Sequence, residues 1–437
     1  MDVVQLKTVI MAGGKGTRIA SVASDIPKPM IPLQGKPILE HQIECLKRYG
    51  LGDIVIILGH LGHIIRDHFG DGSRFGCGIR YYQESSPLGT AGALFEIEPE
   101  LTEDFVLLNG DIIFDIDFTR LVNFHKNSNS DATVVAHPNN HPFDSTLLVT
   151  DDEDRVVDLL NKEEPERYYK NLVNSGIQLI NKRLLSSYRG LSSIPVNASP
   201  GRTDLDRDIL KKTIPVNRVY AYRTPEYIKD MGTPDRYRQA ASDIKNGLVS
   251  RRNLSLPQKA VFLDRDGTIN RLNGFIARPE QFELLDGVAE AIRGLNGSGF
   301  LVIVISNQPV IARGEASFED LRLIHNKMET ELGKRGAFID DIFFCPHHPD
   351  KGFPGERAEL KIDCECRKPK PGLILKAAAR YNIDPAESFM VGDSLTDVRA
   401  GNLAGCRSVL LSEKPDKAIE FSSPTLLDFF ESFVSPK

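Results

Sequence analysis

Two aspartates directly follow a short apolar run in the second half of the chain. Asp264 and Asp266 come after Ala260–Leu263, and such a run is typical of a buried parallel strand. Carboxylates two residues apart at a strand end can both turn toward one Mg²⁺. One can attack phosphorus while the other moves protons on the leaving and entering oxygens. Because Asp-x-Asp sequences also arise by chance in turns, the pair alone does not define a site.

Three later segments carry the other groups that phosphoryl transfer needs. They are Ser306-Asn307-Gln308 after the apolar run 300–305, Arg367-Lys368, and Gly392-Asp393-Ser394 with Asp397. The first offers hydroxyl and amide donors to a phosphoryl group, the second supplies positive charge, and the third adds a metal carboxylate. Together with the aspartate pair, these segments predict a phosphoryl-transfer site.

Cysteine and histidine gather between these segments. Cys345-Pro346-His347-His348 and Cys364-Glu365-Cys366 place three of the chain's six cysteines within 22 residues. Three thiolates and one imidazole form a closed tetrahedral Zn²⁺ site, which is a structural rather than a catalytic arrangement. Spacing does not decide between the two histidines. The bound zinc would hold the loop that carries Arg367 and Lys368.

A glycine-rich turn follows the first apolar run, Lys7–Ala12. It contains Gly13, Gly14, Gly16, Thr17 and Arg18. Backbone N–H groups of such a turn can approach a polyphosphate, and Arg18 can add a charged contact. The turn is neither a P-loop nor a dinucleotide fingerprint. Lys28 lies between two prolines, in a segment predicted to be extended, and Asp111 ends a further apolar run, where parallel sheets bind ligands.

Alternating apolar runs and amphipathic stretches must position these groups. Further strands are expected at Asp53–Leu58, 105–108, 132–136, 176–180 and 388–391, and helices at Ile38–Arg48, 288–295 and 318–335. The alternation predicts an α/β protein with two doubly wound parallel-sheet domains, the first Rossmann-like. We place the domains at 1–245 and 259–437, and the polar segment 246–258 is the predicted linker.

Composition narrows the class of protein. The net charge of −6 gives no basic footprint for nucleic acid or anionic membrane, and no run approaches the length of a membrane helix. No signal peptide is evident, so a cytoplasmic location is expected. Small phosphorylated molecules are therefore the expected partners. The sequence is compatible with a homo-oligomer.

The first half resembles the sugar nucleotidyltransferases, over about residues 6–240. Their signature appears as Gly13-Gly14-Lys15-Gly16-Thr17-Arg18 followed by Pro27-Lys28-Pro29. The resemblance implies that Arg18 and Lys28 offset triphosphate charge and that Asp111 and Asp230 hold Mg²⁺. It also implies that the segment with Gly89 and Thr90 faces the base, that Asn174 and Gly176 belong to a sugar-binding turn, and that Lys162 meets the sugar phosphate. Asn161 stands where the family commonly has Glu, which leaves the sugar open.

The second half, residues 259–413, resembles the haloacid dehalogenase phosphatases. It is most similar to the heptose-1,7-bisphosphate 7-phosphatases and the related histidinol-phosphate phosphatases. This resemblance makes Asp264 the nucleophile, Asp266 the general acid and base, and Asp264, Asp266 and Asp393 the Mg²⁺ ligands. Lys368 and Ser306 would stabilise the phosphoryl group. Substrate contacts would come from Asn307, Gln308, Arg367 and Asn273 in the loop 272–275, and His347 would complete the zinc set with Cys345, Cys364 and Cys366. Pro309-Val310 replaces the usual Ser-Gly.

Three functions are compatible with these resemblances. In the first, the C-terminal half removes the 7-phosphate of D-glycero-D-manno-heptose 1,7-bisphosphate. The N-terminal half then joins heptose 1-phosphate to a nucleotide, with GTP favoured, for a lipopolysaccharide or S-layer glycan. In the second, mannose 1-phosphate guanylylation accompanies a histidinol-phosphate-type or broad sugar phosphatase. In the third, one half is a scaffold without turnover. Fusion favours the first, because one half makes the substrate of the other.

Overall fold

The computed structural model describes residues 6–14, 25–160, 168–195, 198–414 and 419–435. Its residues cluster into two compact units. One comprises 1–137, 148–160 and 174–253, and the other comprises 138–147, 161–173 and 254–437. Among the described helices, none is long and apolar enough to span a membrane. Each unit is described separately below.

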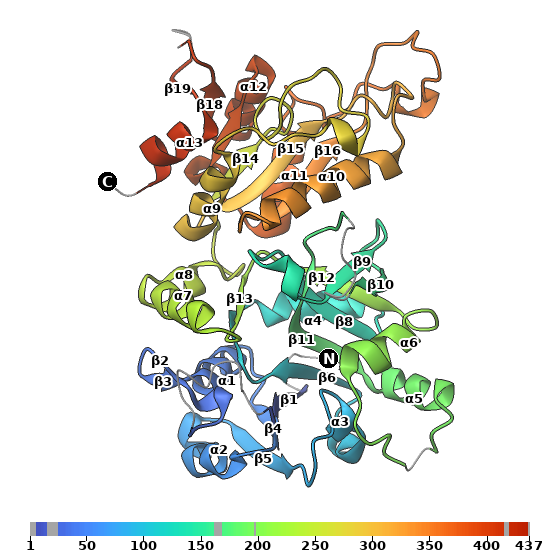
Figure 1. The fold of residues 1–437 in the computed structure, drawn as a ribbon, viewed down its shortest axis with the longest axis vertical. Helices are drawn as coiled ribbons and strands as arrows, with labels where there is room; N and C mark the ends of the chain where they lie inside the picture. Colours follow the sequence, from blue (N-terminus) through green and yellow to red (C-terminus); the bar gives the residue numbers. More distant parts are fainter. Residues whose placement is uncertain (1–5, 15–24, 161–167, 196–197, 415–418, 436–437) are drawn as a thin grey trace. The chain divides into compact units, whose positions relative to one another are not determined.

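The first unit is built on a large mixed sheet (Figure 1). Its main path runs β10-β9-β11-β6-β1-β4-β5, and β8 joins β11 to β12. The strands are β1 (Lys7–Ala12), β4 (Asp53–Leu58), β5 (Gly78–Gln83), β6 (Asp104–Asn109), β8 (Ala132–His137), β9 (Leu147–Thr150), β10 (Val156–Leu160), β11 (Val173–Asn181) and β12 (Val219–Arg223).

The α/β class is confirmed, but this sheet is not wholly parallel. Strands β5, β4, β1 and β6 are parallel, whereas β11 runs antiparallel to β6, with Ile177 opposite Leu108. An apolar run shows that a strand is buried on both faces, and it carries no information about the direction of its neighbours.

Helices cover this sheet because alternate strand residues point to opposite faces. Ile10, Ile56 and Leu108 pack in one apolar core with residues of helices α1, α2 and α4. The helices of this unit are α1 (Ile38–Arg48), α2 (Gly62–Phe69), α3 (Gly92–Glu96), α4 (Phe118–Asn127), α5 (Lys182–Leu191), α6 (Lys211–Thr213), α7 (Pro234–Lys245) and α8 (Leu248–Arg251). Helix α1 has the predicted bounds.

Short strands lie beside the main sheet. Strand β7 (Ile112–Asp115) pairs antiparallel with β13 (Tyr227–Asp230), and β2 (Pro32–Leu33) pairs with β3 (Lys36–Pro37). The prediction of an extended segment at Lys28 was wrong. Residues Lys28–Met30 form a 3-10 turn, because a proline near the start of a helical turn has a suitable φ and needs no N–H donor there.

The second unit has a parallel six-stranded sheet in the order β16-β15-β14-β17-β18-β19. The strands are β14 (Ala260–Leu263), β15 (Leu301–Asn307), β16 (Asp341–Cys345), β17 (Phe389–Gly392), β18 (Arg407–Leu411) and β19 (Phe421–Ser423). The helices are α9 (Val288–Ser298), α10 (Phe318–Gly333), α11 (Gly372–Tyr381), α12 (Leu395–Ala404) and α13 (Leu426–Phe429).

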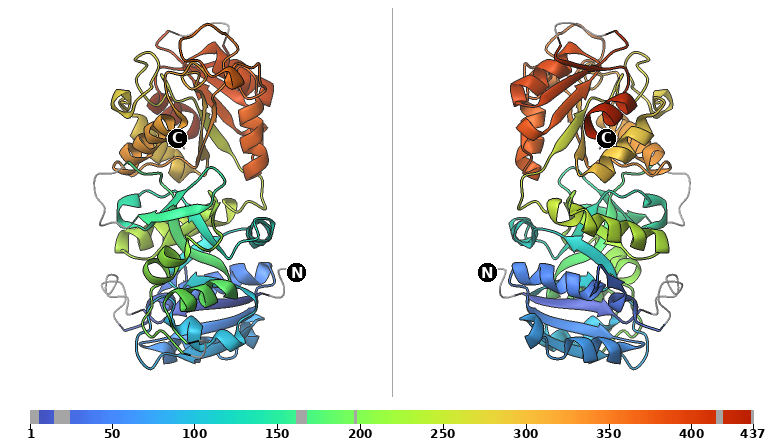
Figure 2. Two further views of the ribbon diagram at one scale, coloured as in Figure 1. Left: turned by 90° about the vertical axis from the view of Figure 1, so that its right-hand side faces the viewer. Right: turned by 90° about the vertical axis from the view of Figure 1, so that its left-hand side faces the viewer.

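Helices cover both faces of this second sheet (Figure 2). Val261 and Leu263 of β14 pack in a core with α9, α10 and α13. The alternate residues Ala260 and Phe262 pack in a separate core with α11 and α12. This arrangement brings the carboxyl ends of β14, β15 and β17 to one edge of the sheet, where ligands of parallel sheets bind.

The predicted linker region contains ordered structure. Helix α8 lies within 246–258, and the side chains of Arg252 and Asn253 are buried. Asn253 donates through Nδ2 to Asp115 Oδ1 at 2.6 Å. The boundary between the two units lies between Asn253 and Leu254, inside the predicted linker.

Candidate active sites

Lys368 is the centre of a buried charge cluster at the carboxyl edge of the second sheet. Its Nζ lies 2.7 Å from Asp264 Oδ1 and 2.7 Å from Asp397 Oδ1, and it donates to the Ile305 carbonyl oxygen at 2.8 Å. Carboxylate oxygens of Asp264, Asp393 and Asp397 all lie within 4.8 Å of one another. One ammonium group cannot neutralise three carboxylates, so the arrangement suits a divalent cation with oxygen ligands.

The protonation of this cluster reflects its burial. Desolvation raises the pKa of Asp264 to about 7, against the charge of Lys368, with repulsion from Asp397 adding to the rise. Burial and the charge of Asp397 also raise the pKa of Asp393. Burial opposes the charge of Lys368, but the two carboxylates it contacts raise its pKa. The lysine is therefore a fixed positive charge beside a carboxylate that changes protonation near neutral pH.

Glycine is required at two positions in this cluster. Gly267 has φ of +84°, and a Cβ atom there would lie 1.9 Å from Asp393 Oδ2. A Cβ atom on Gly392 would lie 2.4 Å from the Asp397 carboxylate. Any larger residue would displace an aspartate, so these glycines let the three carboxylates converge.

Asp266 is held apart from the other three aspartates. Both of its oxygens accept hydrogen bonds from the fully buried guanidinium of Arg265, and its Oδ1 also accepts from Asn270 Nδ2 at 3.0 Å. Gln308 Nε2 donates to Asp266 Oδ2 at 2.9 Å and to Ser306 Oγ at 2.7 Å. The side chain predicted as the proton carrier is thus fixed in direction and engaged with three donors.

The remaining predicted phosphatase residues occupy different places around the cluster. Asn307 donates through Nδ2 to the carbonyl oxygen of Lys368, and the N–H of Lys368 donates to Asn307 Oδ1 at 3.0 Å. Arg367 donates to the carbonyl oxygen of His347 at 3.2 Å. Asn273 is exposed. In this structure Asn307 therefore positions the backbone of Lys368. Arg367 is bound to the backbone of His347, in the loop that carries the cysteine–histidine cluster.

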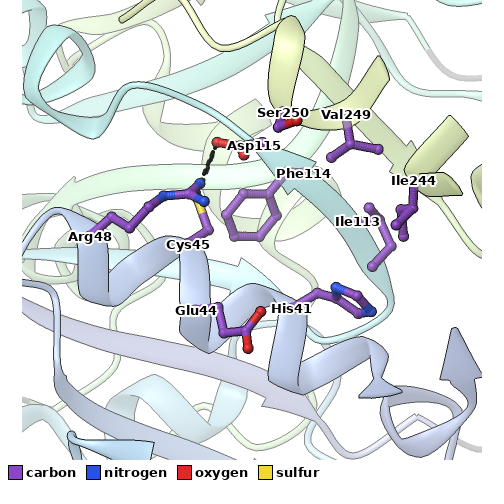
Figure 3. Close-up of a pocket in the computed structure, with 10 residues that line it drawn as sticks. All are labelled: His41, Glu44, Cys45, Arg48, Ile113, Phe114, Asp115, Ile244, Val249 and Ser250. Carbon is purple, nitrogen blue, oxygen red and sulfur yellow. Dashed lines mark hydrogen bonds and ion pairs between the residues drawn. The ribbon is translucent and has the colours of Figure 1, made fainter. Parts of the chain in front are cut away.

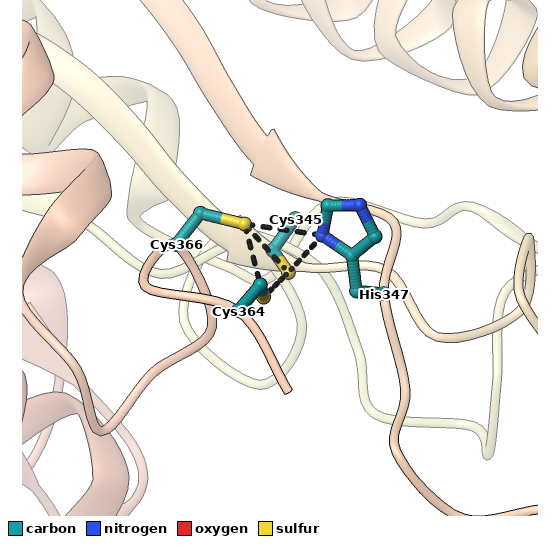
Figure 4. A group of neighbouring side chains, drawn as sticks. All are labelled: Cys345, His347, Cys364 and Cys366. Carbon is teal, nitrogen blue, oxygen red and sulfur yellow. Dashed lines mark hydrogen bonds between the residues drawn. The ribbon is translucent and has the colours of Figure 1, made fainter. Parts of the chain in front are cut away.

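Cys345, His347, Cys364 and Cys366 converge as the sequence predicts (Figure 4). The sulfur atoms lie 3.2–3.5 Å apart, and His347 Nδ1 lies 3.6 Å from Cys345 Sγ and 3.3 Å from Cys366 Sγ. All of these cysteines are free thiols. Donors about 2.3 Å (sulfur) and 2.0 Å (nitrogen) from a shared Zn²⁺ would be separated by roughly these distances. The donor set fits zinc, and His347 rather than His348 belongs to it.

In the first unit, the two aspartates predicted to bind metal form ion pairs with a lysine and an arginine side chain. Lys28 Nζ lies 2.5 Å from Asp111 Oδ2. Both oxygens of Asp230 accept from Arg236 Nη1, at 2.9 and 3.1 Å. Asp111 and Asp230 are neighbours across the β7–β13 pair, because the N–H of Met231 donates to the Asp111 carbonyl oxygen. A divalent cation bound by both aspartates would have to replace these ion pairs.

Only part of the predicted phosphate cradle is described. Gly13 and Gly14 follow β1, whereas Gly16, Thr17, Arg18 and Lys162 lie outside the described residues. A Cβ atom on Gly59 would lie 2.4 Å from the Gly13 carbonyl oxygen. The turns after β1 and β4 are therefore in close backbone contact, which accounts for glycine at both.

The segment predicted to face the base packs against a part of the chain that sequence reasoning missed. Gly89 has φ of +81°, and a Cβ atom there would lie 2.4 Å from the Thr203 carbonyl oxygen. Thr90 Oγ1 donates to Asp204 Oδ2 at 3.1 Å and accepts from the N–H of Leu205 at 2.7 Å. Thr90 therefore caps the start of the 205–210 helical turn.

The same turn reaches the predicted sugar-binding residues. Asn174 Nδ2 donates to Asp206 Oδ1 at 2.9 Å, while Asn174 Oδ1 accepts from the N–H of Gly176. Gly176 has φ of +78°, and a Cβ atom there would lie 2.4 Å from Asn109 Nδ2. The structure thus links the predicted base and sugar segments through residues 203–206, although more than 100 residues separate Thr90 from Asp204 in sequence.

A cavity of about 140 Å³ beside β7 lies among residues of α1, α7 and α8 (Figure 3). Its polar groups have protein partners: His41 Nε2 contacts the Leu33 carbonyl oxygen at 2.8 Å, and Arg48 pairs with Asp115. Burial and the charge of Asp115 raise the pKa of the Cys45 thiol to about 12. The cavity contains no predicted site residue, and its thiol is not a nucleophile at neutral pH.

Some of the contacts in the two predicted sites follow from a sequence pattern, and others do not. Ser394-x-x-Asp397 is a capping pattern, which places Asp397 in the first turn of α12, where its Oδ2 accepts from Ser394 Oγ at 2.7 Å. The pairing of Arg236 with Asp230 and the approach of Asp204 to Thr90 had no comparable signal.

Two family models match the chain. One described as nucleotidyl transferase matches residues 7–247. One described as HAD-hydrolase-like matches residues 365–418. The first covers more than half of the chain.

Curated relatives match about a third of the chain. A D-glycero-beta-D-manno-heptose-1,7-bisphosphate 7-phosphatase of Pasteurella multocida is 42% identical over 154 residues, which are 35% of this chain and 81% of that protein. The phosphatase of the same name from Rhodopseudomonas palustris is 43% identical over 152 residues, 35% of this chain and 82% of that protein. Among solved structures, HddC from Yersinia pseudotuberculosis complexed with GMP-PN is 26% identical, covers 55% of this chain and 100% of that chain, and has a TM-score of 0.47.

Proposed function

Because the chain belongs to the nucleotidyl transferase family through residues 7–247 and to the heptose-bisphosphate 7-phosphatase family through its C-terminal HAD-like domain, we propose that it is a bifunctional enzyme of nucleotide-activated heptose synthesis. The C-terminal domain removes the 7-phosphate of D-glycero-D-manno-heptose 1,7-bisphosphate. The N-terminal domain transfers a nucleotidyl group, GMP from GTP, to heptose 1-phosphate and releases pyrophosphate. The observation that carries the first activity is the convergence of Asp264, Asp393 and Asp397, two of which, Asp264 and Asp397, pair with Lys368.

In the phosphatase reaction, Asp264 is the nucleophile. Its carboxylate oxygen forms a bond to phosphorus while the bond to the sugar oxygen breaks, and Asp266 protonates that oxygen. Asp266 then removes a proton from water, which attacks the phosphoaspartate and releases phosphate. Lys368 lies 2.7 Å from the nucleophile and is positioned to offset charge on the transferring group. The Gln308 and Asn270 contacts fix the side chain of Asp266, which supports its assignment as the proton carrier.

The three converging carboxylates support Mg²⁺ as the cofactor. Asp264, Asp393 and Asp397 would hold the ion, which supplies charge neutralisation and orients the substrate phosphate. The sequence predicted Asp264, Asp266 and Asp393 as the ligands, but the carboxylate of Asp266 is turned to Arg265, Asn270 and Gln308. We therefore assign Asp397 to the metal set and keep Asp266 for proton transfer.

We assign the cysteine–histidine cluster to structural Zn²⁺. With four protein donors the coordination is complete, which leaves no open position for a substrate. Cys366 immediately precedes Arg367 and Lys368, so the zinc would fix the chain at the point where Lys368 enters the site.

For nucleotidyl transfer, the chain supplies positioning and charge rather than a covalent intermediate. The oxygen of the sugar 1-phosphate attacks the α-phosphorus of the triphosphate, and pyrophosphate leaves. Lys28 offsets charge on the triphosphate, and Asp111 and Asp230 would hold Mg²⁺ once their ion pairs with Lys28 and Arg236 open. Asn174 and Gly176 form part of the turn that binds the sugar.

The first experiment is ³¹P NMR of the purified chain with heptose 1,7-bisphosphate and Mg²⁺. Loss of the 7-phosphate with retention of the 1-phosphate supports the assignment, whereas loss of the anomeric phosphate or no turnover refutes it. Asp264→Asn is expected to abolish this reaction and to leave nucleotidyl transfer intact.

The second experiment follows pyrophosphate release from heptose 1-phosphate with GTP, ATP, CTP or UTP. A clear preference for another base would refute the assignment of GTP, and a preference for mannose 1-phosphate over heptose 1-phosphate would refute the sugar. Lys28→Met is the matched variant, because it is expected to lose this activity and to keep the phosphatase activity.

A further inference from the structure

Arg313 has a placement that the catalytic roles above do not explain. Its guanidinium carbon lies 4.5 Å from the ring centroid of Phe275 and 4.2 Å from that of Phe353. The side chain is 19% exposed, and its Nε lies 2.8 Å from Glu315 Oε1. Contacts with aromatic rings use the faces of a guanidinium group and leave N–H donors along its edge for a planar or tetrahedral anion.

The segments that meet at Arg313 start at the phosphatase site. Asn270, which holds Asp266, leads into the loop that carries Phe275. Gln308, which also holds Asp266, leads into the turn that carries Arg313, whose N–H donates to the Pro309 carbonyl oxygen. Phe353 lies in the segment between the metal-binding pairs at 345–347 and 364–366. Arg313 therefore lies where the loops around one site meet.

Backbone contacts fix the position of the turn that carries Arg313. The N–H of Arg357 donates to the Ala312 carbonyl oxygen at 2.9 Å. Gly314 has φ of +74°, and a Cβ atom there would lie 2.0 Å from the Gly355 carbonyl oxygen. The turn is thus pressed against the 350–357 segment, and the arginine is positioned before any ligand arrives, which reduces the entropy lost on binding.

We propose that Arg313 binds the second, non-reacting phosphate of the phosphatase substrate and makes the enzyme selective for bisphosphorylated sugars. The inference rests on the proposed phosphatase function. Lys368 lies beside the nucleophile Asp264 and would contact the reacting phosphate. Arg313 lies on the surrounding loops, where the other end of an extended sugar substrate would lie. A guanidinium edge presents parallel N–H donors that match two phosphate oxygens. Leu272 and Phe275, which are 62% and 49% exposed, offer an apolar surface for the sugar carbons between the two phosphates.

The test compares two substrates that share the reacting 7-phosphate. One is heptose 1,7-bisphosphate and the other is heptose 7-phosphate, which has no second phosphate. Arg313→Met is expected to lower kcat/KM for the bisphosphate by roughly 10- to 150-fold, the loss of one charged contact, mainly through KM. It should change kcat/KM for the monophosphate by less than about threefold. Arg313→Lys should lose less activity on the bisphosphate than Arg313→Met, because lysine keeps the positive charge but lacks the parallel N–H donors of a guanidinium group.

A control variant and two physical measurements separate substrate binding from loop packing. Arg322→Met removes an exposed arginine of α10 that pairs with Glu319, and it should leave both substrates unaffected. Zinc content and Tm of the Arg313 variants should match those of the wild type. An equal loss for both substrates, or no loss for the bisphosphate, would overturn the inference. If the wild-type chain itself cleaves p-nitrophenyl phosphate but not the bisphosphate, the proposed function fails and the inference fails with it.

Discussion

Replacement of Lys368 by methionine is expected to destabilise the metal-free protein and to abolish phosphatase activity. The lysine is 4% exposed, and its Nζ is 2.7 Å from both Asp264 and Asp397. Without it, carboxylates within 4.8 Å of one another lose their counter-charge. Coulomb's law at an effective dielectric constant of about 20 gives roughly 3.5 kcal/mol of repulsion for each ionised pair at that distance. Removal of one partner of a buried ion pair costs a similar amount, about 3–5 kcal/mol.

The assay is calorimetric unfolding at pH 8, with EDTA or with Mg²⁺. A loss of this size corresponds to a decrease in Tm of roughly 6–20 °C for a domain of about 150–250 residues. Mg²⁺ should restore part of the Tm, because it neutralises the same carboxylates, but it should not restore turnover. The control is Lys370→Met, two residues away, whose ion pairs with Asp363 and Glu365 lie at the surface and whose loss should leave Tm and turnover close to wild type. Equal Tm values for the two variants in EDTA would refute the reasoning.

Four further predictions follow from named contacts. The increase in Tm caused by Mg²⁺ should be larger at pH 8 than at pH 6, because Asp264, with a pKa of about 7, must lose its proton to bind the ion. An increase in Tm that does not depend on pH would contradict this. The control is Asp264→Asn, which has no such proton to lose. Removal of zinc by a chelator, followed by assays with Mg²⁺ restored in excess, or the substitution Cys364→Ser, should abolish phosphatase activity and spare pyrophosphate release. Zinc content is measured beside both assays. Lys28→Met should reduce nucleotidyl transfer about 100-fold or more, since the lysine is the cation beside Asp111, with phosphate release as the unaffected reference. Burial and the charge of Arg265 hold the pKa of His325 well below 6.5, so the unfolded chain takes up a proton below pH 6.5 that the folded chain does not. The free energy of unfolding, measured in urea, should therefore fall as the pH decreases through that value. His325→Gln should weaken this pH dependence.

Much of the phosphatase site could be predicted from the sequence because its groups are local to strand ends. Asp264, Ser306 and Asp393 each follow an apolar run, and parallel strands bring such ends to one edge. The cysteine–histidine cluster could be predicted equally well, because short spacings limit where paired cysteines can point. Asp397 had a local signal as well, the capping pattern at the start of α12.

The structure decided what depends on contacts between distant residues. That β11 runs antiparallel follows from its pairing with β6, and an apolar run has no direction of its own. The engagement of Asp266 by Arg265, Asn270 and Gln308 directs its carboxylate away from the converging aspartates, although its spacing from Asp264 would allow both arrangements. Local propensity also failed at Lys28, where the prolines start a turn rather than an extended segment.

The sequence by itself determined the chemistry available to this protein: two phosphate-handling halves, with a cysteine–histidine set in the second. Residue type and short spacing carry that information, because charge, nucleophilicity and metal preference belong to side chains. Only the tertiary structure decided which charges face each other, namely Lys28 with Asp111, Arg236 with Asp230, and Lys368 with Asp264 and Asp397. Each of these pairs except Arg236–Asp230 joins residues far apart in the chain. Among them, only the pairs of Lys368 with Asp264 and Asp397 are largely buried on both sides, and burial makes the energy of such a pair large where an exposed pair contributes little.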